Sequence, residues 1–188
     1  MANKKTFLTH FWKEKKMVGA MSPSSKYLAA KMLESIDFKT TKIIVELGPG
    51  TGVFTKRILE KMQDDAVLYV FELNTSFYQS LCEKITDSRV KILHESAENL
   101  NQFLAEHEFG QVDVIVSSLP LSNFPNSLRT SILQAAHDAL RINGQYIQFQ
   151  YSLQSKKLLR SFFKEMSIDF TAINFPPAFV YRCQKIDS

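Results

Sequence analysis

The stretch Val45-Glu46-Leu47-Gly48-Pro49-Gly50-Thr51-Gly52 decides the fold of this chain of 188 residues. A short apolar run, residues 42–45, leads into it, and residues 53–59 after it are typical of a helix. Between a strand and a helix, glycines let backbone N–H groups approach a ligand that side chains would push away. The alternative is an ordinary tight turn. The spacing differs from the dinucleotide fingerprint GxGxxG, and the GK[ST] ending of a P-loop is missing.

A second acid follows the next apolar run. Residues 67–71 end at Glu72, about twenty residues beyond the glycines, where a carboxylate can accept both hydroxyls of a ribose. The alternative for Glu72 is a solvated charge. With the spacing Glu46-x-Gly48-x-Gly50-x-Gly52, the pattern resembles the S-adenosylmethionine loop of Rossmann-like methyltransferases. The resemblance implies S-adenosylmethionine as cofactor, bound by Glu46, Leu47, Gly48, Pro49, Gly50, Thr51, Gly52, Glu72 and Leu73.

Length and composition favour one domain, because 188 residues with 45% hydrophobic side chains can bury a sizeable core. The two cysteines form no CxxC or Cys/His pattern, so we expect no metal site. Cys82 should lie reduced and buried beside Leu81 and Ile85 on a helix. The sequence shows neither the apolar core of a signal peptide nor an apolar run of about 20 residues. We therefore expect a cytoplasmic protein.

The positive charge is concentrated at the N-terminus. Residues 1–26 hold six lysines and one glutamate, a net charge of +5, whereas the remaining 162 residues carry −1. An anionic partner should therefore meet this segment. Residues 3–18 can form a helix, with Lys4 and Lys15 on or near its apolar side. Its apolar side would present Phe7, Leu8, Phe11 and Trp12, and its other side mostly Lys5, Lys13 and Lys16.

The rest of the chain alternates between expected helices and strands. Ser22-Pro23 should begin a helix that ends near residue 36. Strands are predicted near 42–46, 67–71, 89–93, 112–116, 144–151, 168–174 and 178–184, and helices near 53–62, 75–86, 99–106, 127–140 and 153–166. Pro176-Pro177 should turn the last two strands into an antiparallel hairpin. The pattern predicts an α/β fold: a Rossmann-like, doubly wound, seven-stranded sheet, mostly parallel, with this C-terminal hairpin.

Two more loops should reach the same edge, because ligands of such sheets bind beyond the carboxyl ends of the strands. After the third strand, Ser96 and Ala97 occupy a place where related methyltransferases often have Asp-Ala, whose acid binds adenine. Glu95 and Glu98 flank them. After the fourth strand, residues 117–123 should face the acceptor, although a plain loop broken by proline is the alternative.

Methyl transfer from a sulfonium is an in-line displacement, so the protein mainly has to position a nucleophile with a free lone pair. An amine must lose a proton before it attacks, and Ser117, Ser118 and the carbonyl around Leu119 could offer oxygens to its N–H groups. Ser117 should also contact the cofactor. Tyr151 should line the site as a fourth catalytic residue, or simply pack. No general base is evident.

Over nearly its whole length, the chain resembles the bacterial phospholipid N-methyltransferase family. The resemblance rests on Val18-Gly19-Ala20-Met21-Ser22-Pro23-Ser24-Ser25, on the glycine loop, on Ser117-Ser118-Leu119-Pro120-Leu121, on Gln148-Phe149-Gln150-Tyr151 and on Asn174-Phe175-Pro176-Pro177-Ala178-Phe179-Val180-Tyr181. It implies an enzyme that methylates the amine of a phospholipid or related amino lipid. The oligomeric state stays open.

The same resemblance implies a peripheral protein on the inner face of an anionic membrane. Residues 1–38 would form an N-terminal helical segment that binds the membrane and partly covers the pocket, and residues 39–188 the methyltransferase domain. Alternatively, the first helix only packs on the sheet. The predicted membrane-binding residues are Lys4, Lys5, Phe7, Phe11, Trp12, Lys13 and Lys16.

Two other functions stay open. Ribosomal RNA adenine dimethylases are similar in the glycine loop and in a Leu-Pro acceptor loop, but that family has Asn-Leu-Pro-Tyr. Here Ser118 stands at the Asn position and Leu121 at the Tyr position. Loss of the stacking ring would cost roughly 1–3 kcal/mol of base binding, so we expect no nucleic-acid substrate. A protein that binds the donor or the membrane without catalysis is the other alternative.

Overall fold

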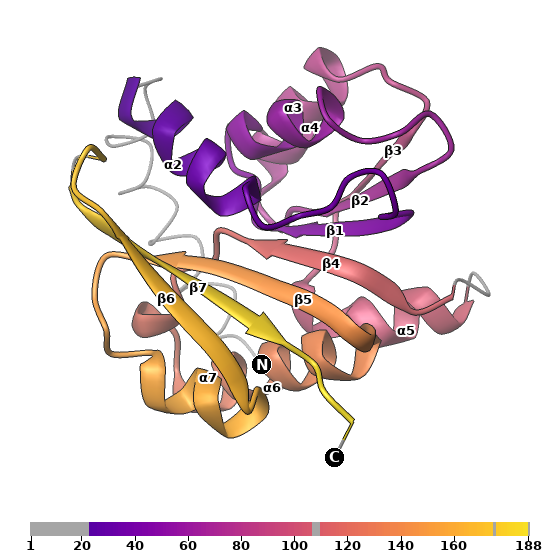
Figure 1. The fold of residues 1–188 in the computed structure, drawn as a ribbon. Helices are drawn as coiled ribbons and strands as arrows, with labels where there is room; N and C mark the ends of the chain where they lie inside the picture. The colour runs from indigo at the N-terminus through magenta and orange to yellow at the C-terminus, as the bar shows by residue number, and fades with distance from the viewer. Residues whose placement is uncertain (1–22, 107–109, 175, 188) are drawn as a thin grey trace.

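The computed structural model describes residues 23–106, 110–174 and 176–187. Within them, seven strands form one sheet between two layers of helices (Figure 1). The strands are β1 Ile43–Leu47, β2 Val67–Phe71, β3 Val90–Leu93, β4 Val112–Ser117, β5 Leu140–Gln150, β6 Glu165–Thr171 and β7 Ala178–Gln184. Their order is β3-β2-β1-β4-β5-β7-β6. Strands β1 to β5 are parallel and β7 is antiparallel to both its neighbours, which confirms the predicted fold class.

The helices cover both faces of the sheet. One face carries α2 Pro23–Leu33, α3 Val53–Leu59 and α4 Thr75–Lys84, and the other carries α5 Leu100–Glu106, α6 Asn126–Ala139 and α7 Lys156–Phe162 (Figure 1). Two short 3-10 helices, η1 Ala97–Asn99 and η2 Leu121–Asn123, follow β3 and β4. Because the strand order reverses between β1 and β4, a crevice for a ligand is expected beyond the carboxyl ends of these two strands.

Several boundaries differ from the sequence predictions. The helix expected over 153–166 is shorter, and β6 begins at Glu165 instead of residue 168. The reason lies at Phe163, which is buried and stacks on Tyr146 with ring centroids 5.4 Å apart, so that the chain turns there. Strand β5 begins four residues earlier than expected, at Leu140, because an irregularity shifts its register against β4 and Asn143 adopts a φ of 63°.

The core has two halves, one on each face of the sheet. Leu28, Ala29 and Met32 of α2 are buried against the sheet, so the described part of the predicted N-terminal segment belongs to the core. Cys82 is exposed, and the expectation that it is buried was wrong. Its neighbour Leu81 takes the inward position of α4, and the next residue of a helix points about 100° away.

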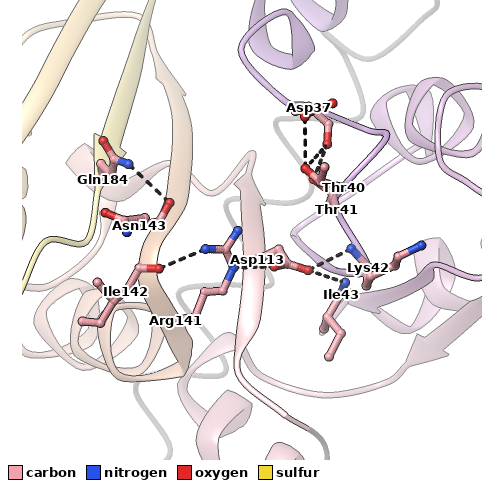
Figure 2. Close-up of polar contacts among 10 residues, drawn as sticks. All are labelled: Asp37, Thr40, Thr41, Lys42, Ile43, Asp113, Arg141, Ile142, Asn143 and Gln184. Carbon is pink, nitrogen blue, oxygen red and sulfur yellow. Dashed lines mark hydrogen bonds and ion pairs between the residues drawn. The ribbon is translucent and has the colours of Figure 1, made fainter.

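At the amino edge of the sheet, one carboxylate joins three strands (Figure 2). Asp113 of β4 accepts hydrogen bonds from the backbone N–H groups of Lys42 and Ile43, at 2.8 and 2.9 Å, where β1 begins. It also pairs with the guanidinium of Arg141 in β5 at 2.5 Å. Burial alone would raise the pKa of Asp113, but these donors outweigh it and lower the pKa below its usual value. Asp113 is therefore a paired, structural carboxylate that joins the three strands at this edge.

Candidate active site

The glycine loop needs glycine for two reasons. Gly48, Gly50 and Gly52 have φ values of 69°, 58° and 80°, in the left-handed region that other residues rarely adopt. Space is also short. A Cβ atom at Gly48 would lie 2.6 Å from Cδ2 of Leu119, and one at Gly52 would lie 2.7 Å from Cδ2 of Leu81. The loop after β1 thus packs directly on the loop after β4 and on α4.

Glu72 fixes this loop from the end of β2. Its Oε2 accepts a hydrogen bond from the N–H of Gly50 at 3.1 Å, and its Oε1 accepts one from the N–H of Asn74 at 2.8 Å. The side chain is completely buried. Each carboxylate oxygen has two lone pairs, so these bonds are compatible with the ribose contact. That contact stays a prediction.

Glu46, at the end of β1, is also completely buried but lacks such support. Among the described residues, neither carboxylate oxygen has a hydrogen-bond partner of ordinary geometry. Burial and the neighbouring charge of Glu72 raise the pKa of Glu46 to about 8, although the nearby hydroxyl and N–H of Thr55 lower it somewhat. A buried carboxyl group without partners is costly and marks a site where a ligand can supply them. A ligand with a cationic or N–H donor group, such as S-adenosylmethionine, fits this position.

The predicted acceptor loop lies beside the glycine loop. Ser117 ends β4 and pairs in register with Leu47 of β1, and the N–H of Ser118 donates to the carbonyl of Leu47 at 2.9 Å. The Ser117 hydroxyl oxygen accepts from the N–H of Leu119 at 3.4 Å. Both serine side chains are buried. The structure therefore brings the glycine loop, Glu72 and residues 117–119 together at one edge.

Two glutamines of β5 hold the acceptor loop; the sequence showed them as part of a motif but predicted no role for them. The Nε2 groups of Gln148 and Gln150 both donate to the carbonyl of Leu119, at 2.9 and 2.8 Å. The hydroxyl of Tyr146 donates to Gln148, and Ser122 donates to Gln150 through its N–H and hydroxyl. The N–H of Leu121 also donates to the Leu119 carbonyl, at 2.9 Å, so this carbonyl already has three donors and no lone pair left for a substrate amine. The signal was two glutamines at alternate positions of residues 146–150, whose other members are tyrosine, isoleucine and phenylalanine.

The residues expected near adenine follow β3 at the same edge. The N–H of Glu72 donates to the carbonyl of Leu93 at 3.0 Å, which joins the ends of β2 and β3. Ser96 caps η1, since its hydroxyl accepts from the N–H of Glu98 at 3.4 Å, and Ala97 is buried. Beside them the ring of His94 stacks on Tyr78, with centroids 4.9 Å apart. The adenine contact of Ser96 and Ala97 stays a prediction.

Tyr151 lies just beyond β5 and is half exposed. Its ring meets Phe149 edge-on with centroids 5.6 Å apart, and Phe149 stacks on Phe54 of α3 at 5.8 Å. These rings connect the end of β5 to the helix that follows the glycine loop. In the described part of the chain, no group of three His, Cys, Asp or Glu side chains could hold a metal ion. The predicted membrane-binding residues Lys4, Lys5, Phe7, Phe11, Trp12, Lys13 and Lys16 lie outside the described residues.

Comparison with known proteins supports both resemblances. The chain is 28% identical to the ornithine lipid N-methyltransferase of Singulisphaera acidiphila over 182 residues, which cover 96% of this chain and 95% of that protein. It is 27% identical over 158 residues to the ribosomal RNA small subunit methyltransferase A of Borreliella burgdorferi. That match covers 79% of this chain but spans only 54% of the RNA enzyme.

The fold also matches solved methyltransferase structures. A 16S rRNA methyltransferase of T. thermophilus, in complex with AdoMet and guanosine, superimposes with a TM-score of 0.64 at 19% identity. The match covers 89% of this chain and 44% of that one, and at this identity it shows the fold alone. The family profile of ribosomal RNA adenine dimethylases matches residues 14–156, well over half of the sequence. The chain therefore belongs to the ribosomal RNA adenine dimethylase family of S-adenosylmethionine-dependent methyltransferases.

Proposed function

We propose that the protein transfers methyl groups from S-adenosylmethionine to the amine of a membrane amino lipid. The observation that carries the proposal is the place of Leu121. It stands where the RNA-methylating relatives have a tyrosine that stacks on the base, and here it is completely buried in η2. A side chain in the core offers no face to a nucleobase. The match to an ornithine lipid N-methyltransferase over nearly the full length of both proteins supports the same substrate class.

An RNA acceptor is the second candidate, because the family profile favours it. It would have to do without the stacking ring and without an amide at position 118, where the chain has Ser118. A stacked base contributes roughly 1–3 kcal/mol, and the loop offers no aromatic replacement within residues 117–123. We therefore rank the lipid amine first.

We propose the following roles for the residues at this edge. S-adenosylmethionine would supply a methyl group that is already activated for displacement. Glu46, the glycine loop and Glu72 would bind it, and Ser96 and Ala97 would contact its adenine. The hydroxyl oxygens of Ser117 and Ser118 would accept N–H bonds from the neutral amine and aim its lone pair at the methyl group. Gln148 and Gln150 would both bind the carbonyl of Leu119 and so hold in place the two serines that precede it in the loop.

A lipid substrate requires the protein to work at a membrane surface. None of the helices in the described ranges is both long and apolar enough to cross a bilayer. We propose a cytoplasmic protein that acts as a peripheral enzyme at the inner face of the membrane, helped by the basic N-terminal residues.

The test is methyl transfer from labelled S-adenosylmethionine by the purified chain. One reaction contains liposomes with phosphatidylethanolamine or ornithine lipid, and another contains deproteinised small-subunit RNA. Label in the lipid fraction supports the proposal. Label in RNA alone contradicts it and makes the chain an RNA enzyme. Bound donor without label in either fraction would favour a protein that only binds.

A further inference from the structure

The exposed large hydrophobic side chains of the described residues are unevenly distributed. There are six of them: Tyr27, Ile142, Tyr151, Leu153, Phe170 and Ile173. Ile142 lies at the amino edge beside Arg141, as Figure 2 shows. The other five belong to segments that meet at the carboxyl edge, where the candidate active site lies. We call Tyr27, Tyr151, Leu153, Phe170 and Ile173 the apolar rim.

Strand register places most of the rim together. Gln150, the last residue of β5, pairs with Phe179 of β7, which pairs in turn with Phe170 of β6. Tyr151 and Leu153 follow directly after β5, and Ile173 lies in the turn between β6 and β7. The hydroxyl of Tyr181 donates to the carbonyl of Ser152 at 3.0 Å, so the loop after β5 is held against β7.

Tyr27 reaches the same edge from α2. This helix ends near the amino edge, where the hydroxyl of Ser35 contacts Oε1 of Gln145 at 3.3 Å. Its first turns therefore extend toward the carboxyl edge, and Figure 1 shows α2 starting at the side where the β6–β7 turn projects. The rim thus borders the acceptor side of the site from two layers of the molecule.

The loops that carry the rim contain no acidic side chain, and Asp169, next to Phe170 in β6, is paired with Lys31 and Arg182. Residues 151–164 and 170–178 contain no aspartate or glutamate. Lys156 and Lys157 begin α7, just after Leu153, and Lys26 precedes Tyr27. Within the described ranges, none of these three lysines lies within ion-pair distance of an acidic side chain. Apolar side chains bordered by unpaired ammonium groups suit an anionic lipid surface.

We infer that the apolar rim is a membrane-docking surface, whose side chains enter the head-group region of an anionic bilayer. Docked in this way, the protein would present residues 117–119 to amines that lie in the plane of the head groups. Four of its five side chains lie outside the N-terminal segment, residues 1–38, that the sequence predicts to bind lipid, and only Tyr27 belongs to that segment. The inference rests on the proposed function, since only a lipid substrate requires the reacting edge to face a membrane.

The experiment is co-sedimentation of the full chain with vesicles of phosphatidylcholine, with and without phosphatidylglycerol. These vesicles contain no amino lipid, so binding does not depend on the substrate. The test variant is Leu153→Asp with Ile173→Asp, at positions 45% and 68% exposed, and the matched control is Ile142→Asp, 40% exposed at the opposite edge. We expect the double variant to bind the anionic vesicles roughly tenfold or more weakly, and the control to bind like the wild type.

Two further measurements separate docking from folding and from chemistry. The double variant should bind S-adenosylmethionine and methylate a short-chain, monomeric amino lipid at the wild-type rate, because neither side chain belongs to the site. Ile173→Trp should bind vesicles more tightly than the wild type, since tryptophan favours the membrane interface. Both results would support the rim as the docking surface.

Equal vesicle binding by the double variant and the wild type would overturn the inference. So would a double variant that changes the sedimentation of the chain without vesicles, since the rim would then contact a second copy. Failure of the proposed function looks different. In that case the wild type would methylate neither the monomeric nor the vesicle-bound amino lipid, whatever its affinity for the vesicles.

Discussion

A partly buried carboxylate at the amino edge of the sheet and a fully buried one at the carboxyl edge have opposite surroundings. At the amino edge, Asp113 meets two backbone N–H groups and the guanidinium of Arg141, and its pKa falls. At the carboxyl edge, Glu46 is more deeply buried, has no partner of ordinary geometry in the described structure, and its pKa rises to about 8. The first carboxylate stabilises the fold, whereas the second destabilises it until a ligand supplies what the protein does not.

The difference identifies which edge is functional. Burying an unpaired carboxyl group is unfavourable in free energy. Such groups occur mainly at functional sites, where a bound ligand can supply the missing partner. The positive φ values of the three glycines lie at the same edge. The buried carboxyl group and the three glycines with positive φ therefore lie together where β1, β2 and β4 end, whereas the amino edge has one positive φ, at Asn143, and its carboxylate is paired.

The largest effect is expected from Gly48→Val. The new side chain would collide with Leu119, 2.6 Å from its Cβ, at a φ of 69° that valine strongly disfavours. Methyl transfer should fall about a hundredfold or more, because the donor loop and the acceptor loop would both move. The matched control is Gly110→Val, where the nearest atom to the added Cβ is 3.9 Å away and φ is not positive. A Gly48→Val enzyme with wild-type kinetics would contradict the packing of the two loops.

The second prediction compares the two carboxylates by replacing each with the amide of the same shape. Asp113→Asn removes the charge that pairs with Arg141 and weakens the acceptor for two N–H groups, so it should lower the free energy of unfolding by about 1–3 kcal/mol. Glu46→Gln should not destabilise the protein in this way. Chemical denaturation of both variants at neutral pH gives the comparison. A larger loss of stability for Glu46→Gln than for Asp113→Asn would reverse the assignment of the two edges.

Measuring the free energy of unfolding as a function of pH gives a sharper test of Glu46. Folded Glu46 has a raised pKa, so it holds a proton between about pH 4.5 and 8 that the unfolded chain has released. Its contribution to stability is therefore complete below pH 4.5 and is lost as the pH rises through about 8. Glu46→Gln should remove this loss, so that the variant becomes more stable than the wild type by a few kcal/mol at alkaline pH. A stability difference that does not change with pH would show that Glu46 titrates normally.

A smaller effect is expected from Glu72→Ala. Loss of the acceptor for Gly50 and of the predicted ribose contact should weaken donor binding by at least about tenfold, or roughly 1.4 kcal/mol. The 2′-deoxyribose analogue of the donor separates these two roles. If Glu72 binds the ribose, the wild type should discriminate against the analogue and the variant should not. Unchanged donor affinity in the variant would remove the ribose assignment.

The sequence alone predicted the fold and those loops that have a distinctive local pattern of residues. The glycine loop and the alternation of apolar runs predicted the strand series, because spacing and periodicity are written in consecutive residues. The boundary between α7 and β6 could not be predicted so well, since it depends on the stack of Phe163 on Tyr146 from a different strand. The exposure of Cys82 likewise depends on which side of α4 faces the sheet.

The sequence predicted which loops meet at the carboxyl edge but not the hydrogen-bond partners of their residues. Glu46 and Glu72 were both expected to contact the donor, and only the structure shows that one is paired with backbone N–H groups and the other is not. Gln148 and Gln150 act on Leu119 across about thirty residues of chain, and no local pattern specifies such a contact. Long-range side-chain partners are thus what the sequence alone leaves out.

The central claim is that the carboxyl edge keeps Glu46 unpaired for the methyl donor. Calorimetric titration of the full chain with S-adenosylmethionine at neutral pH, in two buffers of different ionisation enthalpy, tests it most directly. A cationic donor beside Glu46 should lower its pKa, so binding should release a proton from the wild type but not from Glu46→Gln. Binding without proton release in the wild type, or identical release in both proteins, would contradict the claim.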